Sequence, residues 1–193
     1  MTDTTDTTTR DYNGIKIPLS GTYDLDKAHT TVEFVARHLM ITKVRGRFDK
    51  FDGSFVIADD PKQSSVEVTI DASSISTNEE SRDGHLRSGD FLEVDKYPKI
   101  TYKGTSVDLN SDDTGVIHGE LTIRGTTKPV DLHLEFEGAG NTPMGDYRVG
   151  FSATGEIDRE QFGLTWNQVL EGGGVMVGKV IKLELNVEAI RRQ

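Results

Sequence analysis

The sequence predicts an all-β fold, either a two-sheet sandwich or a closed antiparallel barrel of about eight strands. Apolar and polar residues alternate over most of the chain, which is the period of a half-buried strand. Glycine is abundant, at 20 of 193 residues, and the turns are rich in Gly, Asp, Asn and Pro. Many alternating segments approach ten residues. Because closure removes the long edges that such strands would expose, we favour an extended antiparallel barrel.

Nine segments carry the strand pattern in chain order. They are residues 21–26, 29–38, 51–57, 65–71, 99–104, 115–125, 127–140, 146–158 and 177–190. Their apolar faces combine large and small residues, namely Phe34, Phe51, Phe55, Phe136 and Phe151 with Gly53, Gly119, Gly138, Ala153 and Gly155. A barrel of about eight strands has room for its own side chains or for one small ligand. The pattern therefore leaves open whether these residues interlock into a solid core or line an apolar channel.

Two segments, 37–48 and 81–98, break the alternation. In the second, Ser81 is a predicted helix cap, and Asp83 falls in the first turn, where negative charge is favourable. We expect a short helix that ends near Gly89, followed by an extended run to Pro98. One or two such helices would cover the barrel ends. Asp83 and Asp90 are expected to pair with Arg82, Arg87 or backbone donors.

The first nineteen residues are rich in Thr and Asp and offer little to bury. They predict a disordered tail over 1–19, followed by a barrel domain over 20–193. The start of the chain lacks the basic, apolar and small-residue regions of a secretory signal. No apolar run reaches the roughly 20 residues that span a bilayer. We therefore expect a cytoplasmic protein that is not an integral membrane protein.

Charge and cysteine content exclude several functions. The formal net charge is -10, so nucleic acid and anionic lipid surfaces are disfavoured as partners. The chain has no cysteine, which excludes disulfides, thiolate catalysis and thiolate-bound zinc.

Motifs for enzymatic chemistry are weak. The stretch "GGVMVGKV" at 173–180 resembles a phosphate loop, but Val180 stands where Ser or Thr must bind magnesium, and a strand follows it. No G-x-S-x-G elbow supports a nucleophilic serine. The histidines lack zinc-ligand spacing, although one group is retained as an alternative metal or catalytic cluster at a barrel mouth. The residues of that cluster are His29, His38, Asp83 and His85.

Five segments in order resemble the YceI-like family of lipocalin-like, polyisoprenoid-binding bacterial proteins. They are "DKAHTTVEFVARHL", "VRGRFDKFDGSF", "SISTNEESRDGHLRSGDFLEVDKYPKITYKG", "GELTIRGTTKPVDL" and "IDREQFGLTWN" followed by "EGGGVMVG". The resemblance covers roughly residues 21–190. It implies an antiparallel barrel whose apolar interior holds a long isoprenoid, such as a polyprenyl phosphate or a quinone tail. It further implies a binding protein rather than an enzyme, with no cofactor and no resident metal.

The resemblance also supplies candidate ligand contacts. Those for the apolar channel and its mouth are Phe34, His38, Phe48, Phe51, Leu86, Phe91, Leu121, Phe136, Phe151 and Trp166. Independently of the resemblance, alternate residues of a strand face the same side, so Arg45 and Arg47 can stand side by side and, with Arg82 or Arg87, are candidates for binding a charged head group. The alternative is that these strand residues are solvated and pair with Asp49 and Asp52. Family members often dimerise, so a homodimer is an open alternative. A barrel filled by its own side chains, with no ligand, is a further one.

Overall fold

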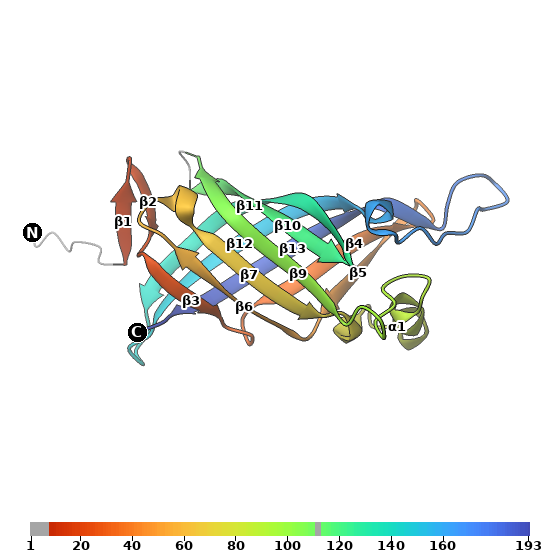
Figure 1. Cartoon of the computed structure of the whole chain (residues 1–193), viewed down its shortest axis with the longest axis horizontal. Coiled ribbons are helices and arrows are strands. Elements are labelled where there is room, and N and C mark those ends of the chain that lie inside the picture. Colours follow the sequence, from red (N-terminus) through yellow and green to blue (C-terminus); the bar gives the residue numbers. More distant parts are fainter. Residues whose placement is uncertain (1–7, 111–112) are drawn as a thin grey trace, which may run out of the picture.

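The protein forms a closed antiparallel barrel, seen in a computed structural model that describes residues 8–110 and 113–193. The ring of hydrogen-bonded strands runs β12–β11–β10–β9–β7–β6–β3–β13 and closes because β13 also pairs with β12. Figure 1 shows the strands wound around one axis, with the helix at one end. The predicted barrel of about eight strands is confirmed, and the sandwich alternative is excluded.

The strands of the barrel are long, as the alternating segments predict. The strands are β1 (Thr9–Tyr12), β2 (Ile15–Pro18), β3 (Gly21–Leu25), β4 (Thr31–His38), β5 (Thr42–Phe48), β6 (Phe51–Ile57), β7 (Ser65–Asp71), β8 (Ile75–Ser76), β9 (Lys99–Leu109), β10 (Thr114–Ile123), β11 (Thr126–Asn141), β12 (Tyr147–Asp158) and β13 (Val177–Arg191). The described helices are α1 (Glu80–Arg87) and the short 3₁₀ turns η1 (Pro61–Gln63), η2 (Ala72–Ser74) and η3 (Arg159–Phe162).

Strands β9 to β12 follow one another as neighbours in the sheet, whereas β7 and β9 are joined through η2, β8 and α1, and β3 and β6 through β4 and β5. β3 and β4 act as one interrupted strand, since both pair with β13, and β4 continues the sheet through β5 and β8. Thus the first and last strands of the barrel lie side by side. The segment 37–48, which breaks the alternating pattern, is the β4–β5 hairpin. Leu39 and Met40 turn there with φ of 53° and 57°.

The structure differs from the predicted disordered tail. Residues 1–7 lie outside the described residues, but β1 and β2 form an antiparallel hairpin from Thr9 to Pro18. Its turn is Asn13-Gly14, with φ of 54° and 85°, which suits the two-residue turn that this dipeptide favours. Ile17 is buried. The low overall hydrophobicity of residues 1–19 concealed this short alternating pattern.

Helix α1 begins at Glu80 rather than at a cap on Ser81. The side chain of Glu79 accepts hydrogen bonds from the backbone N–H groups of Ser81 and Arg82, which satisfies two donors that the first turn leaves unpaired. The helix ends at Arg87, close to the predicted end, and it covers one end of the barrel (Figure 1).

Candidate ligand-binding cavity

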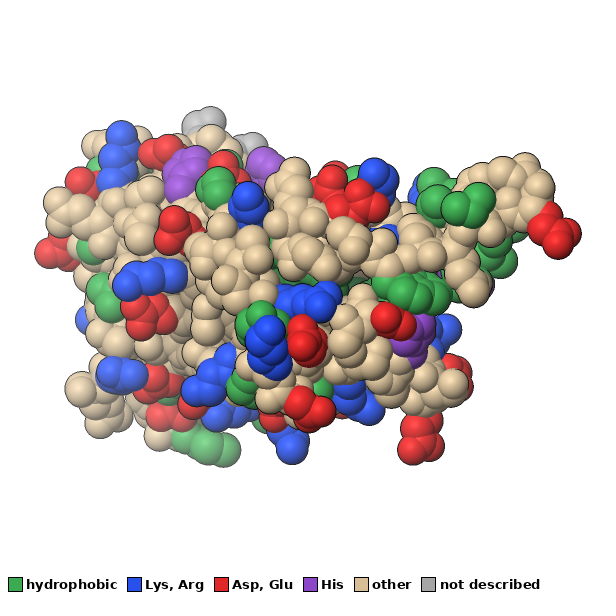
Figure 2. Space-filling model, turned by 45° about the vertical axis from the view of Figure 1, so that its right-hand side comes forward, with side chains coloured by type: hydrophobic (Ala, Val, Ile, Leu, Met, Phe, Trp, Pro, Cys, Tyr) green, Lys and Arg blue, Asp and Glu red, His purple; other side chains and the backbone are tan. Residues whose placement is uncertain are grey.

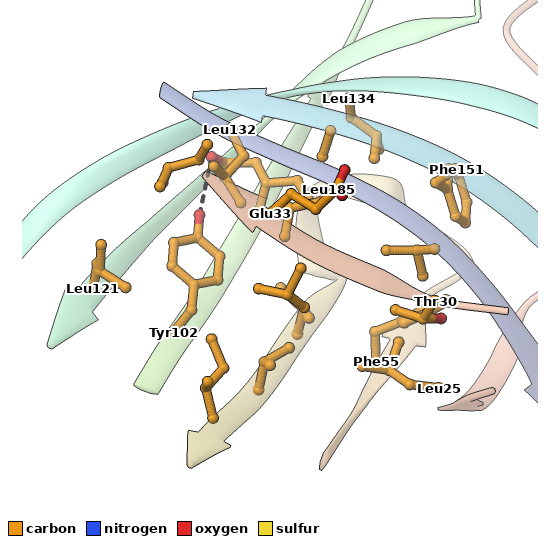
Figure 3. A pocket seen from close by; sticks show the side chains of 18 of the residues that line it. Leu25, Thr30, Glu33, Phe55, Tyr102, Leu121, Leu132, Leu134, Phe151 and Leu185 are labelled. Atoms are coloured by element: carbon orange, nitrogen blue, oxygen red, sulfur yellow. Dashed lines mark hydrogen bonds between the residues drawn. The ribbon is translucent and has the colours of Figure 1, made fainter. Parts of the chain in front are cut away.

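The barrel encloses an apolar cavity of about 350 Å³. Every other residue of its strands points inward, because successive side chains of a strand face opposite sides of the sheet. Figure 3 shows lining side chains from opposite walls pointing into the cavity. They include Phe55, Tyr102, Leu121, Leu132, Phe151 and Leu185. The small residues on the inward faces have therefore not produced a fully interlocked core, contrary to the filled-barrel alternative.

The polar group of the inward Tyr102 is used within the wall. Its hydroxyl donates to the Val130 carbonyl oxygen at 3.0 Å and lies 3.4 Å from that of Ile117, and burial raises the pKa of the phenol, so it stays neutral. Its ring lies against Gly119, where a Cβ atom would come within 2.6 Å of it. The glycine thus makes room for the ring close to the strand. The cavity keeps an apolar surface although a tyrosine borders it.

Aromatic side chains close the barrel near α1. The Trp166 ring lies 5.3 Å from Phe91 and 4.6 Å from His85, measured between ring centroids. His85 Nε2 is 2.8 Å from Asp90 Oδ2, which fixes the imidazole at the surface. Leu86 and Phe91 also line the cavity at this end. The motif "RDGHLRSGDF" therefore supplies the end wall of the cavity.

Hydrogen bonds to backbone groups attach this end wall to the barrel. Arg82 donates from Nε to the Thr77 hydroxyl and from Nη2 to the Thr77 carbonyl oxygen. Arg87 donates to the carbonyl oxygens of Ser73 and Ile75, both at 2.8 Å. The expected pairing of these arginines with Asp83 or Asp90 is wrong, whereas the expected backbone donor is confirmed for Asp83, which accepts from the Thr77 N–H. Strand ends offer the guanidinium groups several carbonyls in a fixed arrangement, whereas Asp90 already pairs with His85.

Arg159 attaches the segment after η3 from within the protein. Only 3% of this residue is exposed, and the partners of its guanidinium are all backbone carbonyls. It donates to Gly178 and Trp166 at 3.0 Å, to Val177 at 3.4 Å, and to Leu164. Burial lowers the pKa of this guanidinium below its usual value. No motif in the sequence pointed to this residue, which holds Leu164 and Trp166 against the start of β13.

The opposite end of the cavity is bordered by the β1–β2 hairpin. Ile15, Lys16, Ile17 and Pro18 line the cavity there. Figure 1 shows the hairpin across the end of the barrel that lies away from α1. The sequence signal for it was "YNGI", an Asn-Gly turn between short alternating segments.

Seven of the ten predicted channel residues line the cavity. They are Phe34, Phe48, Leu86, Phe91, Leu121, Phe136 and Phe151. The other three, all within the described part of the chain, are not among its lining residues. Phe51 packs against the core, and Trp166 packs on the outside of Phe91. His38 lies at the end of β4, paired with Val177 and Thr42.

The four head-group arginines, all within residues 8–110, do not line the cavity. Arg45 pairs with Glu184 and Arg47 with Asp49, both on the outer wall. Arg82 and Arg87 are occupied by the carbonyls already described. Charged side chains of both signs are mixed over the outer wall in Figure 2, so pairing on that face is the ordinary state of a barrel exterior. The alternation placed Arg45 and Arg47 on one face, and that face points outward.

The alternative histidine cluster does not form. His29 precedes β4 and His38 ends it, so at about 3.3 Å per residue the two lie some 30 Å apart. Asp83 is buried against Thr77, and His85 pairs with Asp90. Sequence order alone could not reveal that these residues belong to opposite ends of the barrel.

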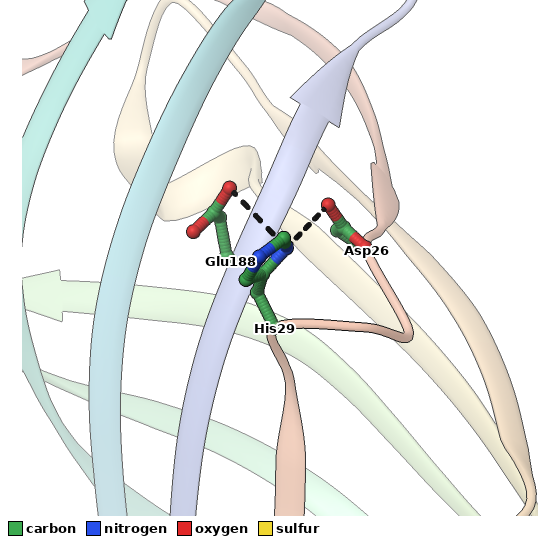
Figure 4. A group of neighbouring side chains, drawn as sticks. All are labelled: Asp26, His29 and Glu188. Atoms are coloured by element: carbon green, nitrogen blue, oxygen red, sulfur yellow. Dashed lines mark hydrogen bonds and ion pairs between the residues drawn. The ribbon is translucent and has the colours of Figure 1, made fainter.

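His29 instead joins Asp26 and Glu188, a group with the composition of a metal site (Figure 4). His29 Nδ1 is 3.0 Å from Asp26 Oδ2, and Arg148 Nη1 donates to Asp26 Oδ2 and Glu188 Oε1 at 2.5 Å each. The hydrogen bonds from His29 and then Arg148 lower the pKa of Asp26 to about 2. The guanidinium already supplies the positive charge between the two carboxylates, so this cluster is an ion-pair network between β13 and the β3–β4 connection.

Fold and site together define a hollow antiparallel barrel with an enclosed apolar cavity. The chain belongs to the YceI-like family, since the family model described as "YceI-like domain" matches residues 23–189. The UPF0312 protein SA2479 of Staphylococcus aureus (strain N315) is 43% identical over 169 residues, covering 86% of this chain and 95% of that relative. Among the helices of the described residues, none has the length and hydropathy of a membrane span.

Two solved structures share the fold. The YCEI protein of Campylobacter jejuni is 29% identical, with a TM-score of 0.69 over 81% of this chain and 90% of that one. A polyisoprenoid binding domain from Saccharophagus degradans, implicated in plant cell wall breakdown, is 14% identical, with a TM-score of 0.62 over 90% of this chain and 100% of that one. At that identity the second likeness concerns the fold alone.

Proposed function

We propose that this protein is a non-enzymatic binding protein that holds a long apolar molecule of the isoprenoid class inside the barrel. The observation that carries the proposal is the apolar cavity along the barrel lumen, whose inward Tyr102 hydroxyl is already paired within the wall. The polyisoprenoid binding domain with the same fold supports the choice of ligand class. The seven predicted residues that line the cavity are the proposed ligand contacts.

The energetics of such a site need no strong polar contact. Burial of each methylene group contributes roughly 0.8 kcal/mol, so a few isoprene units supply micromolar affinity after the cost of association is met. An apolar cavity of this size lies within the usual range for small-molecule sites. We therefore propose that recognition depends on the shape and length of the apolar chain, and that the protein acts as a carrier or reservoir for it.

Co-purification tests the proposal directly. The full chain is purified without detergent, extracted with organic solvent and analysed by mass spectrometry, and protein from which lipid has been removed is then offered geranylgeraniol. We expect a stoichiometric apolar extract or saturable uptake, reported by the fluorescence of the single tryptophan, Trp166. Empty protein in repeated preparations, combined with no uptake, would reject the proposed function.

A variant with a filled cavity provides the specificity control. Ala153 is buried on the inward face of β12 and lines the cavity. Ala153→Phe adds a ring to the cavity and is expected to weaken geranylgeraniol binding at least tenfold. Thr154→Phe, at the adjacent outward position of the same strand, should leave binding unchanged if the ligand occupies the lumen.

A further inference from the structure

The β1–β2 hairpin is an element of this chain that lies outside the family match, which begins at residue 23. Its side chains nevertheless border the cavity, through Ile15 and Ile17. Ile17 is only 6% exposed, although it lies in a four-residue strand near the start of the chain. The buried Ile17 therefore covers part of the cavity that the matched residues 23–189 alone would leave exposed.

The hairpin is built as a defined unit. Its strands pair in a single register from Thr9 with Pro18 to Tyr12 with Ile15. The turn residues Asn13 and Gly14 both have positive φ, which is the requirement of the tight turn between them. Alternation within β2 then directs Ile15 and Ile17 to the same side, toward the lumen.

Polar contacts attach the hairpin to the rim of the barrel. Arg10 donates from Nη2 to the Ala58 carbonyl oxygen at 2.7 Å and from Nη1 to that of Asp59 at 3.0 Å. The Tyr12 hydroxyl donates to Asp60 Oδ1 at 3.1 Å. All three acceptors lie in the short connection between β6 and η1. The hairpin is thus held at one side of the opening, across the end of the barrel.

We propose that the β1–β2 hairpin is the end wall of the cavity at the end opposite α1. We further propose that it sets the longest isoprenoid chain that the protein accepts. This inference rests on the proposed function. The end near α1 is fixed by the hydrogen bonds of Arg82 and Arg87 and by the buried Arg159, so a guest that fills the lumen meets its limit at the hairpin. For each methylene group of the ligand that the hairpin keeps in water, the affinity is about fourfold lower than if that group were buried, because roughly 0.8 kcal/mol of binding free energy is lost.

Two variants of the full chain alter the hairpin in different ways. Gly14→Ala places a side chain at φ +85°, where it is strained, yet the new Cβ atom meets no atom within 4 Å. Ile17→Ala shortens the end wall and leaves the turn unchanged. Gly140→Ala is the matched control, since its Cβ atom also meets nothing within 4 Å and its backbone is not left-handed.

Binding of geraniol, farnesol, geranylgeraniol and solanesol, in order of increasing length, is measured by the fluorescence of Trp166 at the far end of the barrel. For the wild type and Gly140→Ala, affinity should rise along the series and then stop rising. For Gly14→Ala and Ile17→Ala, it should continue to rise, with solanesol bound at least tenfold more tightly than by the wild type. An identical length profile in all four proteins would overturn the proposal.

A second measurement separates this inference from the proposed function. The release rate of the uncharged apolar dye N-phenyl-1-naphthylamine from the cavity requires no isoprenoid binding. It should increase in Gly14→Ala and Ile17→Ala and remain unchanged in Gly140→Ala. If no isoprenoid binds but dye release accelerates, the hairpin is the end wall and the ligand class is wrong. If dye release is equal in all four proteins, the hairpin is not the end wall.

Discussion

The buried carboxylate of Asp83 accepts two hydrogen bonds from Thr77, one from the backbone N–H at 2.8 Å and one from the hydroxyl at 2.5 Å. Both residues are about 6% exposed. The Thr77 hydroxyl also accepts a hydrogen bond from Arg82 Nε at 2.8 Å. The helix that covers the cavity is therefore joined to the strand before it through one side-chain network.

This network predicts a stability effect without a chemical role. Asp83→Ala leaves the buried Thr77 N–H unpaired, which costs roughly 1–3 kcal/mol. For a chain of this size, thermal unfolding should shift down by about 2–4 °C per kcal/mol. Asp90→Ala is the control, because that side chain is 52% exposed and should change stability by less than about 0.5 kcal/mol. Equal shifts in both variants would contradict the assignment.

Gly46 and Phe34 face each other across β5 and β4, and the ring occupies the space above the glycine. A Cβ atom at position 46 would lie 2.2 Å from Phe34 Cζ. Gly46→Ala therefore has to displace a cavity-lining ring, and it should cost about 1–3 kcal/mol of unfolding free energy. Combining it with Phe34→Leu should recover part of the loss. The unfolding free energies of the single and double variants are measured by denaturant unfolding. If the two losses simply add, the position of the Phe34 ring does not depend on Gly46.

The outer wall carries a pH-dependent ion pair. In its protonated form, His118 donates from Nδ1 to Asp131 at 2.9 Å and from Nε2 to Asp108 at 3.1 Å, and these hydrogen bonds, that to Asp131 first, raise the pKa of the imidazole. Because the pKa of His118 is higher in the folded state, its protonation stabilises the fold at pH values below the unfolded-state pKa of about 6.5. This stabilisation is lost as the pH rises through the folded-state pKa.

Replacing His118 by Gln should therefore lower the unfolding free energy at about pH 5.5, and should leave it close to the wild type at about pH 9. Urea unfolding at several pH values measures the difference, with His133→Gln on the neighbouring strand as the control. A difference between wild type and His118→Gln that grows with pH would reverse the sign of the argument.

Arg159 connects the last barrel strand to the loop beyond η3 through four carbonyl oxygens. Arg159→Gln leaves several of these acceptors buried and unpaired, at roughly 1–3 kcal/mol each, so a loss of at least about 3 kcal/mol is expected. Arg159→Lys should recover little, because an ammonium group cannot span acceptors that a planar guanidinium reaches together. Arg45→Gln, at a site 62% exposed, is the control and should be nearly neutral in thermal unfolding.

The period-two pattern predicted the strands and their inward faces because each strand is buried on one side only. Val32 and Phe34, for example, both point into the lumen as their spacing requires. The pattern could not identify partners across strands. Arg45 meets Glu184, far along the chain, and only the closure of β13 on β4 brings them together. His29 and His38 are separated by the extended conformation of β4, which lies between them.

The candidate site was predictable where it depends on local alternation and not where it depends on the barrel ends. Leu86 and Phe91 were placed at a mouth because they interrupt the strands. The hairpin was missed because composition over 1–19 outweighed a four-residue alternation beside Asn13 and Gly14. The role of Arg159 was missed because its partners are backbone atoms, which carry no signal in the sequence.

The pairing of β3 and β4 with β13 has a consequence for biosynthesis. The edge of β3 and β4 that faces β13 finds its partner only after residues 177–191 have been synthesised. Until β13 has been synthesised, the nascent chain presents this unpaired strand edge. Contacts between residues so distant in sequence form slowly. Ribosome-bound chains that end before β13 should be cleaved rapidly by protease, while released chains acquire resistance in one step.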